Sequence, residues 1–176
     1  MEISMDAIKE LREMTSCGVI ECKKALEESK GDFGKAKEIL LKRGLEIAAK
    51  KGSSAAKQGR MEAYIHAGSQ IGVIVEVNCE TDFVARNDDF RNFVRDVAMQ
   101  IAATNPKYIR REQVSEEELK GHPNKDAYFK EVCLMEQPFI KEPQKTIQDC
   151  LNGLIASIGE NILISRFSRY KVGENE

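Results

Sequence analysis

The sequence has no tryptophan and only two histidines, and aromatic residues make up 6% of its 176 residues. It also has no apolar run near the roughly 18 to 20 residues that span a bilayer, so we expect no membrane partner. Charges of the two signs nearly balance, with a formal net charge of −2, which argues against direct binding to nucleic acid. With 41% apolar and 32% charged residues, the composition is that of a soluble globular protein.

The cysteine pattern indicates neither disulfides nor a metal site. The five cysteines are Cys17, Cys22, Cys79, Cys133 and Cys150. Their number is odd and no C-x-x-C occurs, so a disulfide framework and a zinc site are not indicated. Cys22 and Cys79 lie among apolar neighbours and are interpreted as small core residues, whereas the roles of Cys133 and Cys150 stay open. The N-terminal stretch MEISMDAIKE has early acids and no apolar signal core, which predicts a cytoplasmic protein.

Motifs for covalent or nucleotide chemistry are also missing. There is no P-loop and no dinucleotide-binding fingerprint after a strand. Cys79 and His66 are a candidate nucleophile and base, but the hairpin predicted below separates them by roughly 25 Å. A nucleophile and its base must lie within about 3 Å of each other. We therefore predict no enzymatic activity, no metal and no cofactor in this chain.

The first half of the chain predicts a helical head followed by a linker. Apolar residues recur at helical spacing in three short segments within residues 1–45, and Gly44 is placed as the glycine that ends the third helix. Helices this short are not stable alone, so they must pack together as a three-helix head. Residues 46–58 contain Gly-Ser-Ser-Ala-Ala and several lysines, and predict a basic linker that is helical at its start or flexible.

Residues 59–172 predict the main domain. Alternating apolar residues indicate strands at 60–66, 71–79 and 161–170. A hairpin that pairs Ile65 with Ile71 would place both apolar sets on one side, under a helix that begins at Asp88 and stops before Asn105. Further helices are expected at 114–121, where Ser115 and Glu118 are spaced as a capping box, and at 126–136 and 146–158. A frayed tail is expected at 173–176. The predicted class is α+β, with the head tethered to a small antiparallel three-stranded sheet packed with helices.

The turn after the second strand carries an acid beside a large aromatic residue. The stretch EVNCETDFVARNDDFRNFV contains both in a polar context, at Asp82 and Phe83. In one interpretation Phe83 folds back onto the sheet, and Asp82 is an acid at the positive end of a helix dipole. In the other, Phe83 projects outward as an aromatic anchor for a partner protein. The residues alone leave both interpretations open.

Four segments of the chain resemble the elongation factor Ts family, a family of bacterial translation factors. The segment VNCETDFVARNDDF closely resembles the family's core signature, and IKELREMTSCGVIECKKAL resembles its first two helices. LMEQPFIK and GENI are similar to further family segments, and all four occur in the family's order. The chain is short, like the compact class of the family with one copy of the core.

The resemblance implies a guanine nucleotide exchange factor for the GTPase elongation factor Tu, in its GDP-bound and nucleotide-free forms. It implies a wedge that disturbs the Mg²⁺ site of Tu, formed by Thr81, Asp82, Phe83 and Val84. It also implies that the head contacts the G domain of Tu through Arg12, Val19, Ile20 and Lys23. A homodimer that presents two cores to Tu is a further expectation. The alternative is a binding module without exchange activity, because the head also resembles ubiquitin-associated (UBA) docking domains.

Overall fold

The computed structural model describes residues 3–15, 17–51 and 56–174. The centre of the expected linker, residues 52–55, and the last two residues of the expected tail lie outside the described residues. The chain forms two compact units, which are described separately below. The expected domain boundaries at 45, 58 and 172 stay a prediction, which limited proteolysis can test.

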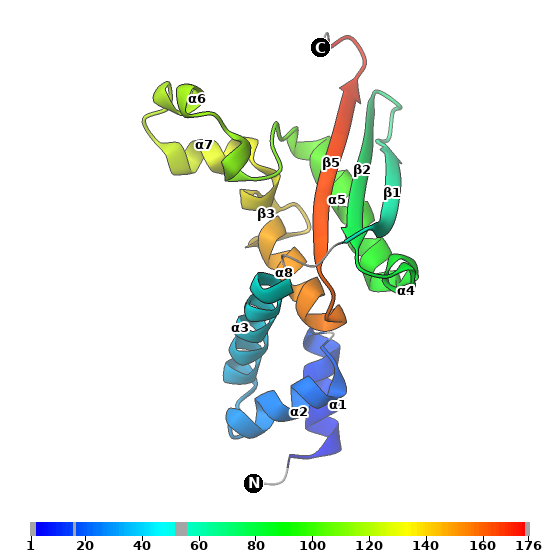
Figure 1. The fold of residues 1–176 in the computed structure, drawn as a ribbon, viewed down its shortest axis with the longest axis vertical. Coiled ribbons are helices and arrows are strands. Elements are labelled where there is room, and N and C mark those ends of the chain that lie inside the picture. The colour runs from blue at the N-terminus through cyan, green and yellow to red at the C-terminus, as the bar shows by residue number, and fades with distance from the viewer. Residues whose placement is uncertain (1–2, 16, 52–55, 175–176) are drawn as a thin grey trace. The chain divides into compact units, whose positions relative to one another are not determined.

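Three helices form the first unit together with the segment Asn152–Asn161 (Figure 1). The helices are α1 (Met5–Thr15), α2 (Val19–Glu28) and α3 (Phe33–Lys51). Each helix turns its apolar stripe inward, as the helical spacing predicted. The buried side chains of this shared core are Ile8, Leu11, Cys17, Cys22, Ala25, Leu26, Ala36 and Leu40. Cys22 is fully buried, which confirms its interpretation as a small core residue.

The predicted helix end at Gly44 is wrong, because α3 continues to Lys51. Gly44 is buried inside the helix. A Cβ atom at Gly44 would lie 2.4 Å from the Cβ of Ala156 and 3.2 Å from the carbonyl oxygen of Asn152. The glycine is therefore needed for the close approach of two helical segments, and not for a left-handed backbone conformation at a helix end.

The second unit is built on a three-stranded antiparallel sheet in the order β1-β2-β5. The strands are β1 (Gln58–Ile65), β2 (Ile71–Cys79) and β5 (Ile162–Lys171). Helix α5 (Asp88–Thr104) packs against β1 and β2, as Figure 1 shows. It buries Phe90, Val94, Val97 and Ile101, the apolar positions from which the sequence predicted this helix. The three-helix unit and this sheet confirm the predicted α+β class.

The hairpin of β1 and β2 has a different register from the predicted one. Ile65 pairs with Gly72, not with Ile71. The carbonyl of Ile71 instead accepts a hydrogen bond from the N–H of His66 at 2.9 Å. Residues 67–70 thus form the loop, one residue fewer than the prediction assigned to it. Two of them, at φ values of 92° and 57°, adopt the left-handed conformation that a tight hairpin loop requires.

This one-residue difference reverses the two faces of β1, because side chains alternate along a strand. Met61 and Ile65 lie on the sheet face opposite α5, where they are 55% and 64% exposed. Ile74 of β2 and Tyr170 of β5 lie on the same face and are also exposed. We call these four side chains the outer apolar face. The prediction had placed Met61 and Ile65 under α5.

The remaining elements follow α5 or connect it to the sheet. They are α4 (Asp82–Arg86), α6 (Glu116–Lys120), α7 (Lys125–Val132), α8 (Ile147–Ile158), the 3₁₀ helices η1 (Arg111–Gln113) and η2 (Leu134–Glu136), and the short strands β3 (Pro138–Phe139) and β4 (Glu142–Thr146). The β3-β4 pair was not predicted, because its strands are short and contain Pro138 and Pro143, and proline is uncommon inside strands. In the described part of the chain, no helix has the length and apolar character needed to cross a membrane.

Candidate partner-binding site

The turn at the end of β2 begins with a buried cysteine. Cys79 is fully buried, and its Sγ donates a hydrogen bond to the carbonyl oxygen of Thr81 at 3.1 Å. The Thr81 hydroxyl in turn accepts a hydrogen bond from the N–H of Val84 at 3.4 Å, which makes Thr81 the N-cap of α4. The polar turn seen in the sequence is therefore a short, capped helix that starts from the sheet core.

Phe83 is the most exposed large apolar side chain described for this protein, at 82% exposure. This excludes the interpretation in which Phe83 folds back onto the sheet. Asp82 lies in the first turn of α4, as expected for an acid near a helix N-terminus, and its Oδ2 accepts a hydrogen bond from Nη2 of Arg86 at 3.0 Å. Residues 81–84 thus lie together at the start of α4. The ring of Phe83 is exposed to solvent, and Asp82 is paired with Arg86 one helical turn further along.

The four head residues lie on the outside of the first unit. Val19 and Ile20 start α2 and are 43% and 68% exposed, so neither side chain fills the three-helix core. Arg12 at the end of α1 and Lys23 on α2 are exposed as well. All four side chains are exposed, two apolar and two basic, and we refer to these four residues as the head surface.

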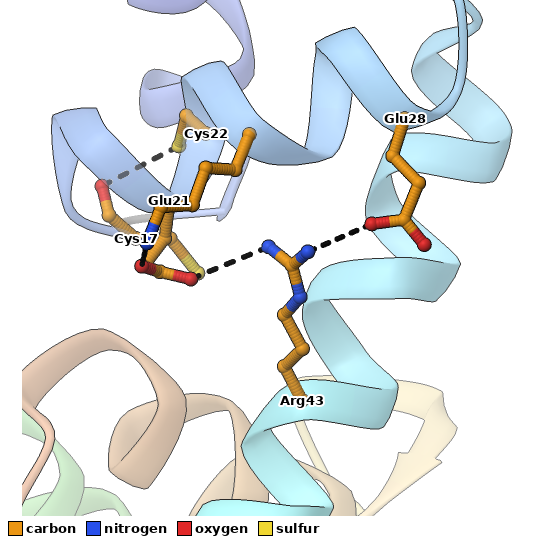
Figure 2. A network of polar contacts seen from close by, with 6 residues as sticks. Cys17, Glu21, Cys22, Glu28 and Arg43 are labelled. Atoms are coloured by element: carbon orange, nitrogen blue, oxygen red, sulfur yellow. Dashed lines mark hydrogen bonds and ion pairs between the residues drawn. The ribbon is translucent and has the colours of Figure 1, made fainter.

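A polar network behind this surface connects α2 to α3 (Figure 2). Arg43 of α3 places its two terminal nitrogens between two acids of α2: Nη1 lies 3.3 Å from Oε2 of Glu21, and Nη2 lies 2.7 Å from Oε2 of Glu28. Arg43 thus connects α3 to α2 through two ion pairs. Sequence reasoning missed this contact because no local pattern pairs residues so far apart in the chain. Figure 2 also shows the two cysteines of this region. The thiol of Cys22 donates a hydrogen bond to the carbonyl oxygen of Cys17 at 3.6 Å. The pKa of the Cys17 thiol is raised because this side chain is buried.

The candidate nucleophile and base are not brought together. Cys79 pairs with Gln58 and Ile162 at one end of β2, whereas His66 follows β1 at the other end of the hairpin. The Cys79 thiol is buried and engaged with the Thr81 carbonyl. This arrangement agrees with the sequence argument against a Cys-His catalytic pair.

Comparison with known proteins identifies the family. The model of the family described as "Elongation factor TS" matches residues 35–125 and 120–174. The elongation factor Ts of Carboxydothermus hydrogenoformans is 50% identical over 195 residues, which cover 98% of this chain and 90% of that protein. Those of Desulforamulus reducens and Caldanaerobacter subterraneus are 48% and 49% identical, again over 98% of this chain. The chain belongs to the elongation factor Ts family of translation elongation factors.

Proposed function

We propose that this protein is a guanine nucleotide exchange factor that binds elongation factor Tu loaded with GDP and promotes the release of GDP. The observation that carries this proposal is the exposed ring of Phe83 at the end of a buried strand. A phenylalanine needs no hydrogen-bond partner, so it can enter an apolar slot in a partner protein at little desolvation cost. In a chain with so few aromatic residues, an 82% exposed ring is a strong indication of a contact surface.

The proposed mechanism makes and breaks no covalent bond. The wedge of residues 81–84 enters the G domain of Tu, and the resulting displacement disturbs the partner's Mg²⁺ and phosphate site. By linkage, binding of the exchange factor lowers the affinity of Tu for GDP by the same factor as GDP lowers its affinity for the exchange factor. Tu then passes through a nucleotide-free complex. The proposed mechanism requires no metal or cofactor bound to this chain.

The head supplies a second contact with the G domain through Arg12, Val19, Ile20 and Lys23. The two exposed apolar residues provide contact area, and the two cations favour an acidic surface on the partner. Because head and wedge belong to one chain, binding of one raises the effective concentration of the other. The partner of this protein is therefore a protein, with no nucleic acid or membrane bound directly, and its place is the cytoplasm where Tu acts.

The test is GDP release from Tu loaded with a fluorescent GDP. The wild-type protein should accelerate release, and Phe83→Ala should lower the maximal stimulated rate about 30-fold, since a central aromatic anchor contributes about 2 kcal/mol. Its melting temperature should stay unchanged, because the ring is almost fully exposed. If the wild type binds Tu but leaves GDP release unchanged, the alternative of a passive docking module holds instead.

We also propose that two copies associate through the outer apolar face, so that two cores are presented to Tu. Met61, Ile65, Ile74 and Tyr170 together expose apolar surface on the side of the sheet that faces away from α5. Contiguous exposed apolar surface is typical of interfaces. Sedimentation at micromolar concentration should show a dimer for the wild type and a monomer for Ile74→Lys. A wild-type monomer under these conditions would exclude the association.

A further inference from the structure

Asn87 lies at the junction between α4, which carries the wedge, and the long helix α5. Its backbone N–H donates to the carbonyl of Val84 at 3.0 Å and so ends α4. Its side-chain Oδ1 accepts hydrogen bonds from the N–H groups of Asp89 at 2.8 Å and Phe90 at 3.2 Å. Its carbonyl accepts from the N–H of Arg91 at 3.0 Å. One residue is thus the C-cap of α4 and the N-cap of α5, and the two helices follow each other directly.

Helix α4 contacts β1, β2 and α5, but it contributes no fully buried side chain to the core. None of its five residues is fully buried, and only Val84 and Ala85 are half-buried. A helix this short is not stable by itself, so its direction depends on how its ends are held. At its start it is held by Thr81 and, through Thr81, by the buried thiol of Cys79.

At its other end, Asn87 is the single residue between α4 and α5. The cap bond from Asn87 to Phe90 leads to a side chain that is fully buried against the sheet. Asn87 is itself exposed, and its φ and ψ of −63° and 138° turn the chain between the two helix axes. Loss of its side-chain acceptor would leave the N–H groups of Asp89 and Phe90 uncapped, while the backbone bond from Asn87 to Val84 remains. The first turn of α5, which follows α4 directly, would then be less firmly held.

Building on the exchange function proposed above, we propose that Asn87 is a positioning residue for the wedge: it fixes the direction in which Phe83 points from the core. A ring that must displace groups in a partner works only from a rigid support, because a mobile support relaxes and leaves the partner undisturbed. Asn87 does not contact the partner in this proposal. It acts through the two helices that it joins.

The proposal is distinguished from ordinary stabilisation by the way exchange depends on protein concentration. A variant that merely lowers the folded fraction needs more protein to reach half-maximal stimulation, but it reaches the wild-type maximal rate at saturation. A variant with a misdirected wedge binds at a similar concentration and shows a lower maximal rate. The two parameters are read from one titration of fluorescent GDP release.

Asn87→Ala removes the acceptor, and the maximal rate should fall about fivefold, the factor that corresponds to loss of a typical helix cap. Asn87→Ser restores a cap without adding charge, and should recover the wild-type rate to within about twofold. Asn124→Ala is the matched control, since Asn124 caps α7 through the N–H of Ala127 at 3.1 Å and the same atoms are removed. It should leave the maximal rate unchanged. Hydrogen exchange of the Asp89 and Phe90 amides should be faster than in the wild type for Asn87→Ala, but not for Asn87→Ser or Asn124→Ala.

Each other result overturns the proposal. An Asn87→Ala maximal rate equal to that of the wild type shows that the cap does not direct the wedge. An equal fall in Asn124→Ala, or a change in the half-saturating concentration alone, shows a general stability effect. No recovery in Asn87→Ser shows that Asn87 acts other than as a cap. A wild-type protein without any stimulation contradicts the exchange function itself, and the faster amide exchange of Asn87→Ala remains measurable in that case.

Discussion

The head surface and the wedge both present an apolar side chain to solvent, but they hold it in different ways. Ile20 is 68% exposed on α2, whose other side is buried in the three-helix core and paired with Arg43. Phe83 is 82% exposed on α4, which buries no side chain fully and is held by caps at its two ends. The helix under Ile20 is supported by a buried core, and the helix under Phe83 by end caps and by partly buried contacts with the sheet and α5.

This difference predicts different responses to mutation. Removing a buried apolar side chain costs about 2 to 5 kcal/mol, whereas removing a helix cap costs about 1 kcal/mol. Changes beneath the head surface should therefore unfold the head before they alter its contact. Changes around the wedge should alter its direction while the unit stays folded. The following experiments test this contrast, from the largest expected effect to the smallest.

The largest effect is expected at Gly44, where two helical segments approach closely. Gly44→Ala should lower the free energy of unfolding by about 1 to 3 kcal/mol, the range for overpacking, because the new Cβ would collide with Ala156. Gly153→Ala is the control: it also lies within a helix, but a Cβ added there would meet no heavy atom of the described residues within 4 Å. Because alanine has a higher helix propensity than glycine, Gly153→Ala should stabilise the protein by up to about 1 kcal/mol. Equal urea denaturation curves for the two variants would contradict the packing argument.

The head surface should change affinity and leave the maximal exchange rate as it is. Ile20→Ala removes contact area without touching the core, so the concentration for half-maximal GDP release should rise about fivefold to tenfold. Leu41→Ala is a matched control, because Leu41 is a 46% exposed apolar residue of α3 outside the proposed contact. A fall in the maximal rate of Ile20→Ala would assign the head a part in the displacement, and the contrast with the wedge would then fail.

Arg43→Met tests the ion pairs between α3 and α2, and a smaller loss of unfolding free energy is expected. The Arg43 side chain is 31% exposed, and its partners Glu21 and Glu28 are 40% and 57% exposed. Partly exposed ion pairs contribute up to about 1 kcal/mol, so urea denaturation should show a loss of that order. The loss should shrink between low and high salt, because exposed charges are screened. A loss independent of salt would indicate packing of the Arg43 stem instead.

In the α6-α7 region, the contribution of hydrogen bonds to stability can be measured from the pH dependence of unfolding. Tyr108 and Tyr128 donate hydrogen bonds to Glu118, and these bonds lower the pKa of that carboxyl below its usual 4.5. A lowered folded-state pKa stabilises the fold above the unfolded-state pKa, and this stabilisation is lost as the pH falls through the folded-state value. Glu118→Gln should therefore flatten the decrease in unfolding free energy between about pH 5 and pH 3. Glu117→Gln, an exposed neighbour on α6, should keep the wild-type decrease.

Local patterns were sufficient to predict the elements with long, regular apolar spacing. The helix from Asp88, the three strands of the sheet and the helical head all follow from such spacing, and the capped turn at Ser115 was also recognised. The capping box expected there forms only in part, because the Glu118 side chain bonds two tyrosines. Its tyrosine partners come from other elements, and no local pattern could have named them.

For the candidate site, the sequence identified residues 81–84 and the four head residues, but not what holds them. The short helix α4 was predicted as a turn, because five residues show no helical period. Arg43 and Asn87 were missed as supports. Arg43 acts across 15 and 22 positions of sequence, and Asn87 acts as a double cap that becomes visible only once both helices are placed.

The sequence by itself determined where the long helices and the three main strands lie, because amphipathic spacing acts over a few residues. It also contained the signature on which the family resemblance depends. Only the tertiary structure decided the hairpin register, the demand for glycine at position 44 and the outward direction of Phe83. Each of these depends on which atoms from distant segments come into contact. Steric contacts and hydrogen bonds between distant segments produce no periodic pattern in the sequence, so sequence patterns do not predict them.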